Sequence, residues 1–206
     1  MEKLQKINYD KVLEDIIENL NYKPNLLLHS CCGPCSSYVI NYLKDYFNIT
    51  ILYYNPNIEP YEEYEKRLDE QIRLINELNI PYLKLLDTNY DNDSYRKEVI
   101  GHENDLEGGA RCHLCYNLRL RKTAIVAKEN NFEYFGTTLT VSPYKNAILL
   151  NSIGEDLSSE YNIKWLYSDF KKKDGYKKSI ELSKKYNLYR QDYCGCLFSK
   201  KKDIYE

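Results

Sequence analysis

Seven cysteines fall in three tight groups, and their placement constrains the fold of this 206-residue chain more than any other feature. The groups are Cys-Cys-Gly-Pro-Cys at 31–35, Cys-His-Leu-Cys at 112–115 and Cys-Gly-Cys at 194–196. Cysteines that act as small core hydrophobes are scattered, and an odd number cannot pair completely as disulfides. Clustered thiols of this kind indicate metal ligands or redox groups, supplied here by segments far apart in the sequence.

The composition is that of a globular protein. Apolar residues make up 43% and charged residues 29% of the chain, and the length suits one domain over 1–206, with 1–24 as an N-terminal helical extension. No apolar run approaches the ~20 residues that cross a bilayer, and the charged segment 1–19 is not a secretory signal. We therefore expect a cytoplasmic protein without a membrane partner, in a reducing compartment that disfavours structural disulfides.

Strand-like and helix-like segments alternate along the chain. Strands are expected at 25–30, 48–54, 82–86, 132–136 and 164–167, and helices at 9–20, 35–46, 60–78, 112–130, 145–153 and 175–186. This alternation predicts an α/β fold with a mainly parallel sheet and helices on both faces.

The cysteine groups occupy positions where such folds bind ligands. The group at 31–35 follows the first expected strand, and ligands of parallel sheets bind beyond the carboxyl ends of the strands. The group at 112–115 begins a helix, where the helix dipole favours thiolates. Neither a Gly-x-Gly-x-x-Gly motif nor a Walker A loop is present, so cysteines stand where a nucleotide-binding protein has its phosphate loop.

The spacing of the thiols leaves more than one metal chemistry open. Four sulfurs from 31–32 and 112–115 suit either zinc or an iron–sulfur cluster. The consecutive pair favours the cluster, because two neighbouring cysteines can bind two different iron atoms of it. The Cys-Gly-Cys at 194–196 suits either a strained redox disulfide or ligands to a second metal ion. Cys35, one helical turn beyond the consecutive pair, is expected beside the same site.

The charge distribution is uneven. Residues 164–206 contain 12 basic and 6 acidic side chains, although the whole chain has a formal net charge of −2. Lysine runs such as 171–173 and 200–202 suit phosphate contacts or a solvated surface equally well.

Six motifs, in this order, resemble the QueH-type epoxyqueuosine reductases over about residues 26–198. They are His-Ser-Cys-Cys-Gly-Pro-Cys-Ser-Ser (29–37), Tyr-Tyr-Asn-Pro-Asn-Ile (53–58), Glu-Tyr-Glu-Lys-Arg (63–67), Arg-Cys-His-Leu-Cys (111–115), Gly-Thr-Thr-Leu-Thr-Val-Ser-Pro-Tyr-Lys (136–145) and Tyr-Cys-Gly-Cys (193–196). The resemblance implies a Rossmann-like fold of the HUP, or PP-loop-ATPase-like, type, with a metal site at the C-terminal ends of the strands.

The resemblance also implies an oxidoreductase in tRNA processing. Members of the family reduce epoxyqueuosine at the wobble position of tRNA to queuosine, the last step of queuosine biosynthesis. The epoxide oxygen leaves as water, and the reaction takes two electrons and two protons. The implied partners are a tRNA with epoxyqueuosine in its anticodon and an electron donor that the sequence does not identify.

Residue roles follow from the matching motifs. The expected 4Fe-4S ligands are Cys31, Cys32, Cys112 and Cys115. Cys194 and Cys196 are expected to be catalytic, as a redox-active disulfide or as ligands of an additional iron or zinc ion, and Cys35 is then a further candidate ligand. The expected substrate-binding residues are Asn57, Arg67, Ser142 and Lys145. A metal with an open position, or an acid, would polarise the epoxide oxygen.

Three other functions fit parts of the pattern. An ATP-dependent tRNA thiolation enzyme with an iron–sulfur cluster would share the fold, but the phosphate loop is missing. A non-catalytic zinc-binding RNA module would use the same thiols without redox chemistry. A general disulfide oxidoreductase needs fewer than seven cysteines.

Overall fold

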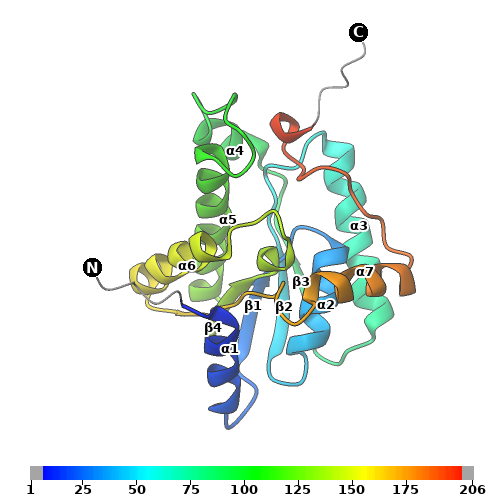
Figure 1. Ribbon diagram of the computed structural model, residues 1–206, viewed down its shortest axis with the longest axis vertical. Coiled ribbons are helices and arrows are strands. Elements are labelled where there is room, and N and C mark those ends of the chain that lie inside the picture. Colours follow the sequence, from blue (N-terminus) through cyan, green and yellow to red (C-terminus); the bar gives the residue numbers. More distant parts are fainter. Residues whose placement is uncertain (1–6, 201–206) are drawn as a thin grey trace.

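A five-stranded parallel sheet forms the centre of the molecule in the computed structural model, which describes residues 7–200 (Figure 1). The strand order is β3-β2-β1-β4-β5, and every neighbouring pair is parallel. The strands are β1 (Asn25–His29), β2 (Asn48–Tyr53), β3 (Lys84–Asp87), β4 (Tyr134–Thr137) and β5 (Lys164–Trp165). The start of the N-terminal extension (1–6) and the lysines at 201–202 lie outside the described residues.

Seven α-helices surround this sheet within residues 7–200. They are α1 (Tyr9–Glu18), α2 (Gly33–Leu43), α3 (Tyr61–Leu78), α4 (Asn92–Glu98), α5 (Ala110–Glu129), α6 (Ala147–Tyr161) and α7 (Gly175–Lys185). Two short 3-10 turns, η1 (Leu139–Val141) and η2 (Leu197–Ser199), complete the architecture. The predicted α/β fold with a parallel sheet is confirmed.

The side chains of β1 explain why helices cover both faces. Leu26 and Leu28 point to one face and Leu27 to the other, as the two-residue period of a strand requires, and all three are fully buried. One face packs against α5 and α6, and the opposite face packs against α1 and α2, with α3 and α7 beside them. Strands buried on both sides need continuous apolar runs, which the sequence supplies.

The structure differs from the sequence-based expectations in two elements. The short helix α4 was not predicted, because its seven residues are polar apart from one buried tyrosine, Tyr95. Helix α6 begins at Ala147, where the Asn146 side chain caps it, and runs eight residues beyond the expected end at 153. Within residues 7–200, no helix combines the length and apolar character that a membrane crossing requires.

Candidate active site

The first cysteine group lies at the turn between β1 and α2, at the carboxyl edge of the sheet. Cys32 is the N-cap of α2, and Pro34 stands in the first turn, where its missing N–H costs nothing. The sulfurs of Cys31, Cys32 and Cys35 all lie within 4.8 Å of one another, and the first two are 3.7 Å apart. Within the part of the chain that the structure describes, this is the one set of three or more potential metal ligands this close together.

These three thiols do not hold their protons equally. Hydrogen bonds from the Cys31 and Cys35 thiols, and from the Gln191 amide at 3.1 Å, lower the pKa of Cys32 well below its usual value. The pKa of Cys35 is raised, because it gives up hydrogen bonding to Cys31 and Cys32 when it ionises and because it is buried. Cys32 is therefore the first thiolate of the group.

The second cysteine group lies in the first turns of α5, and both of its thiols are buried. The Cys112 sulfur accepts a hydrogen bond from the Gly108 N–H at 3.2 Å. Burial raises the pKa of Cys115 to about 12. The preceding loop is held by Arg111, whose buried guanidinium donates to backbone carbonyls of that loop, so the start of α5 has a fixed position.

The third group separates its two thiols. The Cys194 sulfur lies 3.1 Å from Nζ of Lys145, whereas Cys196 is buried and accepts a hydrogen bond from the Tyr95 hydroxyl at 2.8 Å. All seven cysteines of the chain are free thiols here. A redox disulfide between Cys194 and Cys196 therefore stays a prediction.

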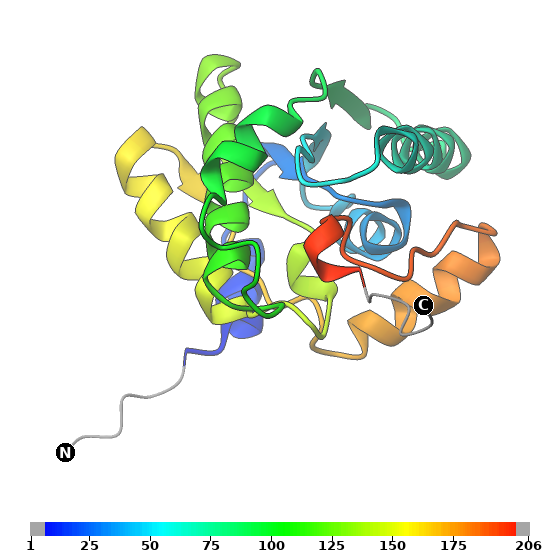
Figure 2. The same ribbon diagram turned by 90° about the horizontal axis from the view of Figure 1, so that it is seen from above.

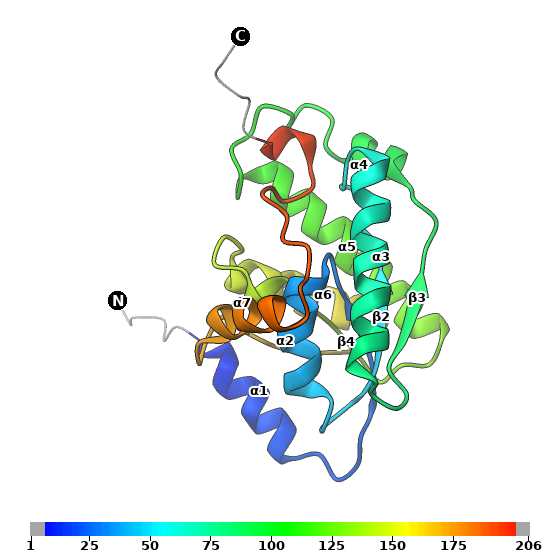
Figure 3. The ribbon, with the colours of Figure 1, turned by 90° about the vertical axis from the view of Figure 1, so that its right-hand side faces the viewer.

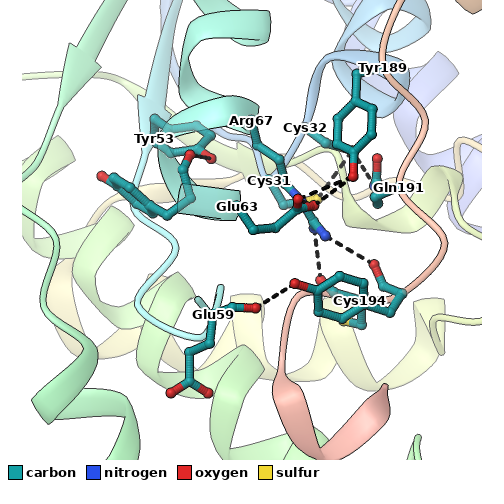
Figure 4. Close-up of polar contacts among 11 residues, drawn as sticks. Cys31, Cys32, Tyr53, Glu59, Glu63, Arg67, Tyr189, Gln191 and Cys194 are labelled. Carbon is teal, nitrogen blue, oxygen red and sulfur yellow. Dashed lines mark hydrogen bonds and ion pairs between the residues drawn. The ribbon is translucent and has the colours of Figure 1, made fainter. Parts of the chain in front are cut away.

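The C-terminal segment (residues 186–200) carries this third group across the carboxyl edge of the sheet. Figure 2 shows it passing between α3 and the loop that precedes α5, and Figure 3 shows it rising from α7. Arg67 of α3 anchors it, because its guanidinium donates to the carbonyls of Tyr193 and Cys194, each at 3.2 Å (Figure 4). Glu63 pairs with the same guanidinium at 2.7 Å, which balances its charge.

A cavity of about 700 Å³ opens where these segments meet. Cys31 and Cys35 line it from the first group and Cys194 from the third, with Lys145 on the wall between η1 and α6. Burial opposes the charge of Lys145, but Cys194 and Tyr116 outweigh that effect and raise its pKa. A cation thus faces thiols inside a space large enough for a small-molecule group.

Arg119 is a cavity residue that the sequence analysis missed. It lies one helical turn after Cys115 on α5, is 1% exposed and lines the same cavity. Burial lowers the pKa of the Arg119 guanidinium, but the negative charges of the Cys115, Cys194 and Cys31 thiolates have the larger effect and raise it. The four-residue spacing from Cys115 was the available signal, because it places both side chains on one helix face.

The four expected substrate-binding residues fall in two places. Ser142 and Lys145 line the cavity. Arg67 holds the C-terminal segment, and Asn57 is fully buried, with no hydrogen-bond partner for its amide among residues 7–200. Neither of these two lines the cavity, so their contact with a substrate stays a prediction.

The histidine that precedes the first cysteine group is structural. His29 is fully buried between the Thr137 hydroxyl and the Tyr54 carbonyl, each at 3.1 Å. Burial, followed by the charge of Arg119, lowers the pKa of His29 to about 3, so the ring stays neutral at physiological pH.

The donor set fits a thiolate-bound metal. Sulfurs around a tetrahedral ion with metal–sulfur bonds of about 2.3 Å lie about 3.8 Å apart, which is close to the 3.7 Å between Cys31 and Cys32. Thiolate ligands select zinc or iron–sulfur centres. In addition, a nitrogen of Arg119 is buried without a hydrogen-bond partner in the described chain, and an anionic group in the cavity would satisfy it.

The chain is similar to known proteins over most of its length. The family model described as epoxyqueuosine reductase QueH matches residues 26–202. The chain is 44% identical to the epoxyqueuosine reductase QueH of Staphylococcus epidermidis, over 97% of this chain and 87% of that protein. It is 40% identical to the one of Streptococcus pyogenes, over 96% and 80%, and 36% identical to the one of Thermotoga maritima, over 84% and 89%.

Proposed function

The chain belongs to the epoxyqueuosine reductase QueH family, and on this premise we propose that it reduces epoxyqueuosine in tRNA to queuosine. The observation that carries the proposal is the cavity at the carboxyl edge of the sheet, where thiols of the first and third cysteine groups meet two buried cations, Lys145 and Arg119. Its volume of about 700 Å³ suits an extruded modified base. The reaction removes the epoxide oxygen as water and forms a carbon–carbon double bond, which consumes two electrons and two protons.

We propose that Cys31, Cys32, Cys112 and Cys115 hold a 4Fe-4S cluster. Cys35 is then a ligand of an additional iron or zinc ion, which its place in the three-thiol group supports. When bound, such a cluster supplies electrons one at a time, from a donor that is not identified. The all-sulfur donor set supports this centre, and such a thiolate-bound centre suits work in the reducing cytoplasm.

The chain's own residues would bind and orient the epoxide. The Lys145 ammonium stays charged in the cavity and can donate a hydrogen bond to the epoxide oxygen as the carbon–oxygen bonds break. Ser142 offers a second polar contact on the same wall. Of the two thiols in the Cys-Gly-Cys group, Cys194 lines the cavity and is the one that can contact the bound epoxide. Cys196 does not line the cavity, and its sulfur is held there by the Tyr95 hydroxyl.

The rim of the cavity suits an RNA strand. Tyr144 is 76% exposed beside the cavity and offers a free ring for a base to stack on. Arg190 and Lys200 also line the cavity and are exposed, so they can contact phosphates. These residues support a tRNA anticodon as the partner.

Anaerobic reconstitution tests the proposal. Iron and sulfide are counted first, and the loaded protein is then incubated with epoxyqueuosine-containing tRNA and a chemical reductant. We expect queuosine among the nucleosides after digestion. A fully loaded protein that forms no queuosine would contradict the function, and a Cys112→Ala variant that keeps its iron and activity would contradict the ligand assignment. Lys145→Met should lose activity at least ~100-fold, whereas Lys177→Met, at an exposed lysine of α7, should not.

A further inference from the structure

Arg119 is a buried cation without a carboxylate partner among the side chains that the structure describes. Its contacts are long: Nε lies 3.4 Å from the Cys115 carbonyl, and Nη1 lies 3.5 Å from the Asn55 side-chain oxygen. Nη2 has no hydrogen-bond partner within residues 7–200, and none of the carboxylates whose side chains the structure describes (7–200 except residue 87) forms an ion pair with Arg119. A guanidinium removed from water in this way is costly unless an anion compensates it.

The comparison with Arg111 shows that burial alone does not explain this arrangement. Arg111 lies on the same helix and is also 1% exposed, but its Nη1 donates to the carbonyls of His102, Glu103 and Asp105 at 2.6–3.2 Å. The backbone therefore satisfies Arg111. Arg119 is left to face the cavity, where its anionic partner must come from the thiols or from what they bind.

The thiols around Arg119 come from all three cysteine groups. Its charge acts most strongly on Cys115, then on Cys194 and Cys31. These groups lie far apart in the sequence and converge around one guanidinium. A cation at this convergence stabilises whichever bound state carries more negative charge.

We propose that Arg119 is the charge partner of the metal centre and stabilises its reduced form. The inference rests on the proposed function, because it requires a thiolate-bound iron–sulfur cluster. The negative charge of four thiolates is larger than the positive charge of the iron–sulfur core, so the bound cluster is an anion. Reduction by one electron adds one further negative charge. A fixed guanidinium favours the reduced form more than the oxidised form, and it therefore raises the reduction potential. In this proposal Arg119 acts on the cluster through its positive charge and does not contact the epoxide.

A redox titration of reconstituted protein tests this role without measuring turnover. Wild type, R119Q, R119K and R121Q are reconstituted anaerobically, iron and sulfide are counted, and the reduced cluster is quantified by EPR at fixed potentials. R121Q is the matched control, because Arg121 is on the same helix but pairs with Glu160 at the surface. At an effective dielectric constant of about 20, two unit charges about 10 Å apart interact strongly enough to change an equilibrium more than tenfold. In R119Q we therefore expect the ratio of reduced to oxidised cluster to fall at least tenfold, equivalent to a shift of about 59 mV for one electron.

The outcomes separate this inference from the function on which it rests. A wild-type protein that takes up no cluster overturns the proposed function. A loaded R119Q with the wild-type ratio, or with no larger change than R121Q, overturns the role of Arg119. If R119Q takes up no cluster, R119K decides: loading of R119K supports the charge role, because charge is the property that lysine shares with arginine. Loss of loading in both variants, with R121Q loaded, overturns it in favour of packing.

Discussion

Replacing Arg67 with methionine should release the Cys-Gly-Cys segment while leaving the rest of the fold intact. The guanidinium is 1% exposed and donates to the carbonyls of Tyr193 and Cys194, each at 3.2 Å. A hydrogen bond from a charged donor contributes about 1.5–3 kcal/mol, so the loss of two lowers the free energy of opening this segment by about 3 kcal/mol. Each 1.4 kcal/mol is a factor of ten, and the open population should therefore rise about 100-fold.

Thiol alkylation of the metal-free, reduced protein measures that opening. Cys196 is buried and reacts only when the segment opens, so its labelling rate follows the open population. Mass spectrometry of the labelled peptides should show the ~100-fold increase at Cys196 in R67M, a smaller one in R67K, and none at Cys112 in α5. Arg121→Met, which removes an exposed ion pair, is the control variant. An unchanged rate at Cys196 would refute the anchoring role, and an equal increase at Cys112 would show global unfolding instead.

Three further predictions concern the same region. Gly195→Ala should increase the labelling of the segment in the same assay, because φ is +114° and an added Cβ would lie 2.8 Å from Ile58. Titration of metal-free protein with Co²⁺ should give thiolate charge-transfer absorption. Cys35→Ser should lower the Co²⁺ affinity at least ~10-fold and Cys112→Ser should lower it less, because Cys35 belongs to the three-thiol group. Glu70→Gln should cost about 1 kcal/mol of unfolding free energy at pH 7 and less at pH 3.5, as measured by urea denaturation. An ion pair with Arg73 and a backbone amide lower the pKa of the Glu70 carboxyl, so its contribution is present at neutral pH and lost as pH falls through the lowered pKa; an equal cost at both pH values would contradict this.

The fold was predictable because its longer elements carry strong periodic patterns. The apolar run at 25–30 and the amphipathic pattern at 60–78 became β1 and α3 with small shifts at their ends. Helix α4 carries no such pattern, because six of its seven residues are polar. Its position depends on tertiary contacts of Tyr95, whose hydroxyl reaches Cys196 about a hundred residues later in the chain. A contact of this range leaves no local signal.

The thiols of the candidate site and Lys145 stood out in the sequence, whereas the second buried cation of the cavity, Arg119, did not. Cysteine groups are visible because clustering is rare and has few chemical explanations. Arg119, by contrast, is one of many basic residues in the sequence, and it is distinguished by its burial and by a guanidinium nitrogen without a hydrogen-bond partner in the described part of the chain. Arg67 shows the same limit: its guanidinium holds the C-terminal segment, a contact that its motif did not indicate, and its contact with a substrate stays a prediction. Whether a basic side chain meets a carbonyl, a carboxylate or a cavity depends on distant segments.

The electrostatic role of the β1–α2 turn explains how this fold accommodates thiols where other α/β proteins bind phosphate. In both cases an anion lies at a helix N-terminus beyond the end of the first strand, where N–H groups and the helix dipole favour negative charge. Here Cys32 supplies the anion as the N-cap of α2, and hydrogen bonds lower its pKa. Lys145 and Arg119 add positive charge on the cavity wall. An anionic thiolate–metal centre therefore needs no change in the charge pattern of the fold, only a change in the atoms that carry the negative charge.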